Sequence, residues 1–400
     1  MAPIATSPAQ PSALEAIKAK TVGHDINAII SGEIDFEKLT ITPEESKTKD
    51  DSYEFNFLRP AFPDIQLPPI PLKEEQDKAF LADPNNNYAN LLRDATSVVH
   101  VNPKIGTEIT GVDLTTLDDT QKNELALLIA RRLVVVFRDQ EKLDVYKQIE
   151  LGKYFGELHV NANTPIPVGY DQHPDLKAIH VVYADEKRRP FADSSTFWHS
   201  DVTYEVQPAG YTSLKSLEAP STGGDTLWSS GYALYDALSP SLQKYLEGLK
   251  ATHTSLEQGQ TIQKLGLPIR RPPITTEHPI VRTHPVTGFK SIFVDRGFTR
   301  SIVGVPKSES DAILNYLYTL GSTLQEAQYR LKWNVNDIAF WDNRTTLHSA
   351  VFDFYPQRRH GIRVTTQAEV PYFDPNGKSQ TEVIEAAIAA KRGDQHVPRN

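Results

Sequence analysis

The stretch DIAFWDNRTTLHSAVFDFYPQRRHGIRVTTQAE, residues 337–369, decides the fold class of this chain. It contains three short runs rich in β-branched and aromatic residues, which are typical of strands, at 337–343, 348–354 and 361–369. Further runs of this kind occupy 178–184, 209–219, 223–230 and 291–298. Many short strands without regular βαβ alternation favour a β-sandwich or barrel.

Segments with helical spacing interrupt these strands, so we expect a mainly β core decorated by α-helices. In one of them Leu125, Leu128 and Ile129 fall on a single face, and an aspartate at 118 or 119 lies near the expected cap. The expected helices cover 118–132, 144–156, 229–249, 308–321 and 380–395. We also expect a bent hairpin at 97–117 and a fully buried strand at 133–140.

Proline usage divides the chain. Five prolines fall within PAFPDIQLPPIP, residues 60–71, a composition that excludes a helix or a central strand and predicts an extended arm. The expected parts are an N-terminal Pro-rich extension at 1–90 with short helices at 13–20 and 32–39, a main domain at 91–375, and a helical tail at 376–400.

Composition narrows the class of protein. Asp+Glu 51 against Lys+Arg 42 gives a net charge of −9, which lacks the basic footprint of a general nucleic-acid binder. No apolar stretch approaches the roughly 20 residues of a membrane helix, and the first residues carry no targeting pattern. We therefore expect a cytoplasmic protein that binds neither nucleic acid nor membrane; a homo-oligomer stays open. With Cys 0, any metal must be held by His, Asp or Glu.

A candidate metal site begins in WHSDVTY, residues 198–204. On an extended chain, positions i and i+2 point to one face, so His199 and Asp201 present an imidazole and a carboxylate side by side. With His348 from the later run, they would form the 2-His-1-carboxylate triad of non-heme iron. Taken alone, the H-x-D pair is also explained by a histidine with a nearby acceptor.

Two arginines follow this metal candidate. Arg359 and Arg363 share a face if their segment is extended, and a guanidinium fork suits a carboxylate. Thr226 emerges at the head of a strand after the Gly223–Gly224 turn. Arginines exposed on an edge strand are the alternative. His278 and His284 flank prolines and are interpreted as structural, and KRRP at 187–190 as solvated charge or part of a lid.

The ordered blocks GVDL, VVVFRDQ, FGELH, WHSDVTY, STGGDTLW, RTHPVTGFKSIFV, NDIAFWDNRTTLH and YPQRRHGIRV lie between residues 103 and 372. Together they resemble the taurine dioxygenase-like (TauD/TfdA) family of Fe(II)- and 2-oxoglutarate-dependent dioxygenases, and most closely its fungal members that act on sulfonates. The resemblance implies a double-stranded β-helix (jelly roll), with the catalytic domain at 91–375. It also implies oxidation of a small anionic substrate by O2, with release of succinate and CO2.

By this resemblance His199, Asp201 and His348 would be the iron ligands. Thr226 and Arg359 would bind the distal carboxylate of 2-oxoglutarate. Arg363 would face the substrate anion or the proximal carboxylate of 2-oxoglutarate.

The resemblance identifies the substrate less directly than the reaction. An alkylsulfonate such as taurine is expected, yet FGELHVNAN, residues 155–163, keeps His159 and has Asn161 where the sulfonate-handling members show a second histidine. Tyr204 would line the pocket, or it belongs to the core. Two alternatives stay open: a related oxygenase that hydroxylates, desaturates or cyclises an amino acid or secondary metabolite, and a non-catalytic jelly-roll binding protein.

Overall fold

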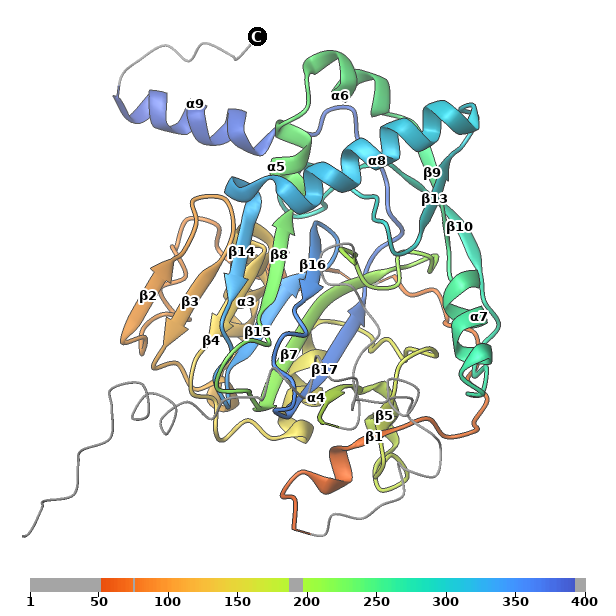
Figure 1. Ribbon diagram of the computed structural model, residues 1–400. Coiled ribbons are helices and arrows are strands. Elements are labelled where there is room, and N and C mark those ends of the chain that lie inside the picture. Colours follow the sequence, from red (N-terminus) through yellow and green to blue (C-terminus); the bar gives the residue numbers. More distant parts are fainter. Residues whose placement is uncertain (1–51, 75, 187–196, 393–400) are drawn as a thin grey trace, which may run out of the picture. The chain divides into compact units, whose positions relative to one another are not determined.

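A seven-stranded sheet forms the centre of the fold. The computed structural model describes residues 52–74, 76–186 and 197–392. The sheet has the order β2-β3-β4-β15-β7-β17-β6, and every neighbouring pair is antiparallel except β3 with β4 (Figure 1). In that order the strands are Ser97–His100, Thr107–Thr110, Val134–Phe137, Ile338–Asp342, Ala209–Glu218, Arg359–Gln367 and His180–Ala184.

A smaller sheet packs on one face of this large sheet. Its order is β14-β8-β16, with the strands Gln328–Leu331, Thr226–Ser230 and Thr346–Ala350. Trp228 of β8 lies against Trp341 of β15, with 5.7 Å between their ring centroids. Because side chains alternate along a strand, Val134 and Val136 of β4 join this inter-sheet core.

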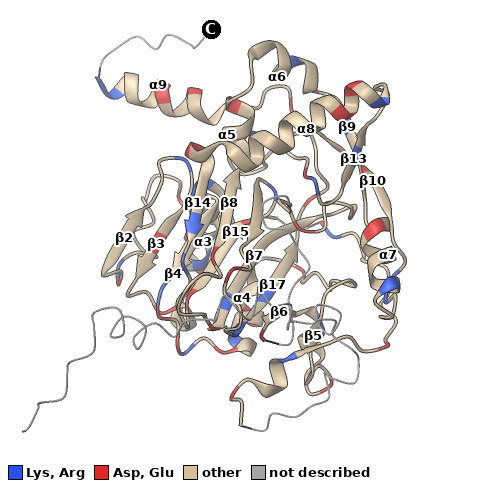
Figure 2. Cartoon of the chain, in the orientation of Figure 1, with Lys and Arg blue, Asp and Glu red and all other residues tan. Residues whose placement is uncertain are grey.

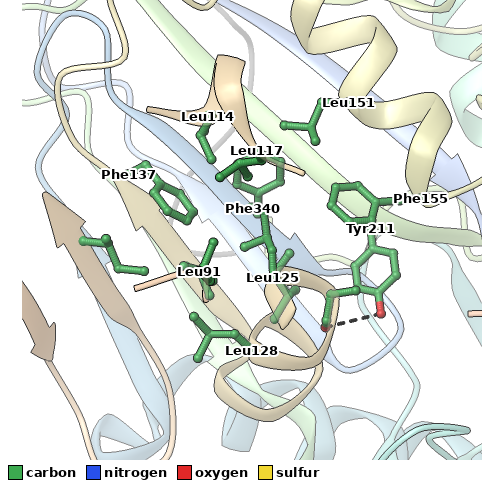
Figure 3. Packing of buried hydrophobic residues seen from close by; sticks show 14 of the residues in the cluster. Leu91, Leu114, Leu117, Leu125, Leu128, Phe137, Leu151, Phe155, Tyr211 and Phe340 are labelled. Carbon is green, nitrogen blue, oxygen red and sulfur yellow. Dashed lines mark hydrogen bonds between the residues drawn. The ribbon is translucent and has the colours of Figure 1, made fainter. Parts of the chain in front are cut away.

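Helices cover the opposite face of the large sheet. Val135 and Phe137 of β4 point to that face and pack with residues of α3 (Asp119–Arg132), as Figure 3 shows for Phe137. Asp118 caps α3 through a reciprocal pair of hydrogen bonds with Gln121. The helix α4 (Val145–Phe155) follows and ends at Gly156. Burial on both faces explains why β4 reads as a continuous apolar run.

The remaining elements lie around these layers. Short sheets are formed by β1 (Pro60–Ala61) with β5 (Ile166–Pro167), by β11 (Val281–Thr283) with β12 (Lys290–Ile292), and by β10 (Thr275–Pro279), β9 (Lys250–Thr254) and β13 (Thr299–Ile302). The other α-helices are α5 (Gly231–Asp236), α6 (Pro240–Leu246), α7 (Leu256–Lys264), α8 (Lys307–Thr323) and α9 (Gln380–Arg392). Figure 2 shows acidic and basic residues interspersed along these elements.

Most of the expected elements are confirmed, including the hairpin of β2 and β3, the buried strand β4 and the extended chain at 60–71. The single helix expected at 229–249 is wrong, because Ser239 caps a new helix with Pro240 in its first turn. The strand expected at 291–298 ends at Ile292, and Asp295 instead accepts a hydrogen bond from the Phe298 backbone N–H. The helix α7 was not expected.

Several predictions are not tested by this fold. The helices expected at 13–20 and 32–39 and the KRRP segment at 187–190 lie outside the described residues. The domain boundaries at 90 and 375 stay predictions. Within the described ranges, no helix is both long and apolar enough to cross a membrane.

Candidate active site

Two distant segments meet at the candidate metal centre. The His199 backbone N–H donates to His348 O at 3.1 Å, and the His348 N–H donates to His199 O at 2.7 Å. This isolated antiparallel bridge places the two residues directly opposite each other, with 4.2 Å between their ring centroids. The bridge therefore brings two imidazoles to one face, although 148 positions separate them in the sequence.

Asp201 completes the cluster. Its Oδ1 lies 3.6 Å from His199 Nε2 and 3.8 Å from His348 Nε2, and the three potential ligand atoms all lie within 4.8 Å of one another. Among the described residues this is the one group of three or more His, Cys, Asp or Glu so arranged. Neither ring nitrogen of the buried His348 has a hydrogen-bond partner, so the donor set fits a 2-His-1-carboxylate metal site.

The protonation states also suit a metal. Burial raises the pKa of Asp201, but the Arg363 guanidinium and the two histidines outweigh it and hold the pKa well below its ordinary value. Burial, aided by His199, lowers the pKa of His348 well below its ordinary value. The carboxylate is therefore ionised and the imidazole neutral near pH 7, as metal ligands must be.

Asn343 holds the Asp201 backbone in place. Its Oδ1 accepts from the Asp201 N–H at 2.9 Å, and its Nδ2 donates to the Asp201 carbonyl at 3.0 Å. Asn343 is fully buried in the turn between β15 and β16. The sequence analysis did not single it out, since nothing in the local pattern links it to Asp201.

Arg359 of β17 lines a cavity and contacts Thr226 of β8. Its Nη2 donates to Thr226 Oγ1 at 3.0 Å, and the same oxygen accepts from Trp333 Nε1 at 2.9 Å. The Arg359 side chain is buried, and its Nη1 has no hydrogen-bond partner. Burial, with the charge of Arg363, lowers its pKa to about 10, so it stays cationic at neutral pH. A buried cation with a spare donor fits a carboxylate.

The turn before Thr226 requires glycine. Gly223 and Gly224 both have φ +71°, and a Cβ at Gly223 would lie 2.4 Å from Asp353 Oδ1. That carboxylate instead accepts from the Gly224 N–H at 2.8 Å. The glycine pair thus lets the chain approach Asp353 closely and start β8 at Thr226.

Arg363 points to the candidate metal site formed by His199, Asp201 and His348. Its Nη1 lies 2.8 Å from both Asp201 oxygens, and its guanidinium lies 5.2 Å from the centre of the Trp341 ring. Trp341 also packs against His348, at 5.3 Å between ring centroids. Arg363 Nε is buried without a partner. Arg359 and Arg363 were predicted to share a face of their strand, and both do line the same cavity.

That cavity has a volume of about 290 Å³. It is lined by the three triad residues, both arginines and Asn161. His159 and Tyr204 are buried but do not line it: His159 Nε2 faces Glu205 Oε1 at 3.6 Å, and the Tyr204 hydroxyl donates to Gln258 Oε1 at 3.2 Å. A larger cavity of about 520 Å³ beside Tyr211 and Arg344 lies away from this cluster.

The cavity wall includes residues that the sequence analysis did not identify. His180 of β6 pairs in register with Arg363, and burial with the Arg363 charge lowers its pKa to about 3. Gln258 comes from α7, and Phe197 and Phe298 flank His199. His278 and His284 lie elsewhere: His278 Nε2 donates to the Glu205 carbonyl and His284 Nε2 to Asp342 Oδ2, as expected of structural histidines.

A jelly-roll fold whose cavity combines a 2-His-1-carboxylate cluster with a buried arginine defines a class, the non-heme metal-dependent oxygenases. The chain belongs to the Taurine catabolism dioxygenase TauD, TfdA family, which matches residues 97–365. Membership confirms the predicted jelly roll and the predicted enzyme class, an oxidoreductase of the α-ketoglutarate-dependent dioxygenases.

Individual relatives agree with this membership. The chain is 40% identical over 319 residues to the alpha-ketoglutarate-dependent sulfonate dioxygenase of Saccharomyces cerevisiae, covering 76% of each chain. It is 30% identical to an alkylsulfatase of Acinetobacter baylyi, covering 67% of this chain and 83% of that one. The solved taurine dioxygenase of Burkholderia xenovorans has a TM-score of 0.59 at 32% identity, covering 71% of this chain and 94% of that one.

Proposed function

We propose that the chain binds ferrous iron through His199, Asp201 and His348 and couples the decarboxylation of 2-oxoglutarate to the oxidation of an alkylsulfonate by O2. The observation that carries the proposal is the gathering of three ligand atoms within 4.8 Å on the wall of a cavity shared with Arg359 and Arg363. The bound iron supplies the activation of dioxygen; the protein supplies binding, orientation and charge.

Thr226 and Arg359 are proposed to bind the distal carboxylate of 2-oxoglutarate. The spare Nη1 of Arg359 is buried, so a carboxylate there would make a charge-assisted hydrogen bond away from water. Thr226 Oγ1 already accepts from Arg359 and Trp333, which leaves its own hydrogen free to donate to the same carboxylate.

The sulfonate is proposed to lie against Arg363, with Asn161 as a neutral helper. The sulfonate and sulfate named for two relatives support an anion of this kind. A sulfonate is ionised at any working pH and needs donors that stay protonated, which a guanidinium does. His159 and Tyr204 do not line the cavity, so we propose that they influence substrate binding indirectly. Tyr204 would do so by holding Gln258 in place through its hydrogen bond.

The proposed reaction balances. One oxygen atom of O2 enters succinate, and the C1 carboxylate of 2-oxoglutarate leaves as CO2. The second oxygen atom enters the C–H bond next to sulfur and gives a 1-hydroxysulfonate. Its C–S bond then breaks as the hydroxyl proton leaves, and the products are an aldehyde and sulfite.

Residues 91–375 are proposed to form the catalytic domain.

A succinate- and sulfite-release screen tests the proposal. The purified chain with Fe(II) and 2-oxoglutarate is offered alkylsulfonates, sulfate esters and amino acids, with His348→Ala as the control. We expect succinate in step with sulfite for a sulfonate, and metal analysis should show less iron bound by His348→Ala. Succinate release driven by an amino acid instead, without sulfite from any sulfonate, would replace the sulfonate by another metabolite. No succinate with any compound would favour the non-catalytic alternative.

A further inference from the structure

Apolar side chains flank the metal ligand His199 on the cavity wall. The Phe197 ring lies 4.5 Å and the Phe298 ring 6.2 Å from the His199 ring, centroid to centroid. Val202, close by in the chain, also lines the cavity. A substrate carbon held near this ligand therefore lies among groups that favour a hydrocarbon over a charged group.

The cavity offers little to a positive group. Among the described residues that line it, Asp201 is the one carboxylate, and both of its oxygens accept from Arg363 Nη1. The nearby Glu205 carboxylate faces His159 and does not line the cavity. An ammonium has three donors and no acceptor, so it would lack a partner of opposite charge here.

Gln258 is one of two neutral amides among the described residues of the cavity wall, the other being Asn161. Its Oε1 accepts from the Tyr204 hydroxyl at 3.2 Å and from Asn163 Nδ2 at 3.0 Å. With Oε1 engaged twice, the group that Gln258 has left for a ligand is its NH2, which is a donor. An amide held this way can serve an oxygen of the substrate but not an ammonium.

The charges also favour a simple monoanion. Bound iron brings two positive charges, Arg359 and Arg363 bring one each, and Asp201 removes one. The two negative charges of 2-oxoglutarate leave a single positive charge for the substrate to match. A sulfonate with an uncharged tail matches it. A sulfonate that also carries an ammonium leaves that positive charge unmatched, which is costly where the charged groups are shielded from water.

We propose that the enzyme prefers alkylsulfonates with an uncharged, apolar tail to aminosulfonates, and that a neutral side chain at position 258, here Gln258, maintains this preference because a carboxylate there would pair with an ammonium. The inference rests on the proposed function and names the substrate class within it.

The direct test compares two compounds of the same size. Propane-1-sulfonate carries a methyl group where taurine carries its ammonium. The readouts are kcat/KM from sulfite release and the Kd of each compound from calorimetry without O2, on protein loaded with Fe(II) and 2-oxoglutarate. We expect propane-1-sulfonate to be favoured over taurine by at least about tenfold in both.

The role of Gln258 is tested by Gln258→Glu, which adds one carboxylate in nearly the same shape. Both hydrogen bonds to Oε1 survive the change, because Tyr204 and Asn163 are the donors. The variant should shift the ratio of the two kcat/KM values toward taurine by at least about tenfold. The neutral control Gln258→Met should leave that ratio within about threefold of the unmodified enzyme.

The outcomes separate the two claims. Taurine used as well as propane-1-sulfonate, or better, overturns the inference while the sulfonate function stands. An unchanged ratio in a folded Gln258→Glu variant removes the role of Gln258. Sulfite from neither compound, nor from any other sulfonate, overturns the proposed function and the inference with it.

Discussion

Replacing Arg359 by Ala should weaken 2-oxoglutarate binding strongly. Arg359 is 5% exposed, and its Nη1 has no hydrogen-bond partner, so a carboxylate that binds there is shielded from water. Removing one partner of a desolvated charge pair costs about 2–5 kcal/mol. Since about 1.4 kcal/mol is tenfold in affinity, the Kd should rise by roughly 30-fold to a few thousand-fold.

Thr226→Val provides the comparison. It removes the one hydrogen bond that an uncharged hydroxyl donates to the cofactor, worth about 1 kcal/mol, or roughly a fivefold rise in Kd. The same change leaves the donors of Arg359 and Trp333 without their acceptor. It should therefore lower the free energy of unfolding by about 1–3 kcal/mol, whereas Thr226→Ser should restore both properties.

The assay is a calorimetric titration of 2-oxoglutarate into the Fe(II)-loaded protein without O2. Arg358→Ala is the matched control, because Arg358 lies against Tyr53 and Glu218 and does not line the cavity. Its Kd should stay within about twofold. The affinity of the unmodified protein should fall as the pH rises through about 10, where Arg359 loses its proton. A larger effect of Thr226→Val than of Arg359→Ala would refute the placement of the cofactor.

The other predictions concern the metal, the substrate anion and pH. His199→Ala should lose iron and turnover with its unfolding curve unchanged, and Asp201→Asn should bind iron far more weakly because it removes the anionic ligand; metal analysis and succinate release check both. Arg363→Ala should reduce substrate-stimulated succinate release more than it changes the Kd of 2-oxoglutarate. Asn161→His should preserve or improve sulfonate use, because a protonated imidazole adds charge to the cavity, and a loss of use would contradict the placement of the anion. Burial raises the pKa of Asp295 to about 6, so stability should fall as the pH rises from about 4 to 6; Asp295→Asn should abolish that fall and gain up to about 3 kcal/mol at pH 7 in urea unfolding.

Local pattern was sufficient for most of the elements. The strand 133–140 was recognised from its apolar run, and α3 from its spacing and its aspartate cap. The helical spacing of 229–249 continues through Ser239–Pro240, although a serine cap followed by proline favours the start of a new helix there. The helix α7 is not evident from the sequence because it is nine residues long and buries few side chains, Gly259 and Ile262.

The sequence by itself determined the chemistry of the site. The relation of His199 to Asp201, and that of Arg359 to Arg363, follows from the alternation of side chains along an extended chain, which any reader of the sequence can apply. His348 and Thr226 were candidates from their own segments, and the likeness of ordered blocks to a known family implied their roles. These predictions needed no knowledge of which strands pair.

Only the tertiary structure decided what surrounds that chemistry. His199 and His348 face each other because an antiparallel bridge joins them, and His180 faces Arg363 because β6 pairs with β17 in one register. Gln258 and Phe298 reach the same cavity from segments that share no local pattern with the proposed metal ligands. The register of distant strands and the packing of helices on them depend on burial summed over the whole fold, so a short stretch of sequence does not contain them.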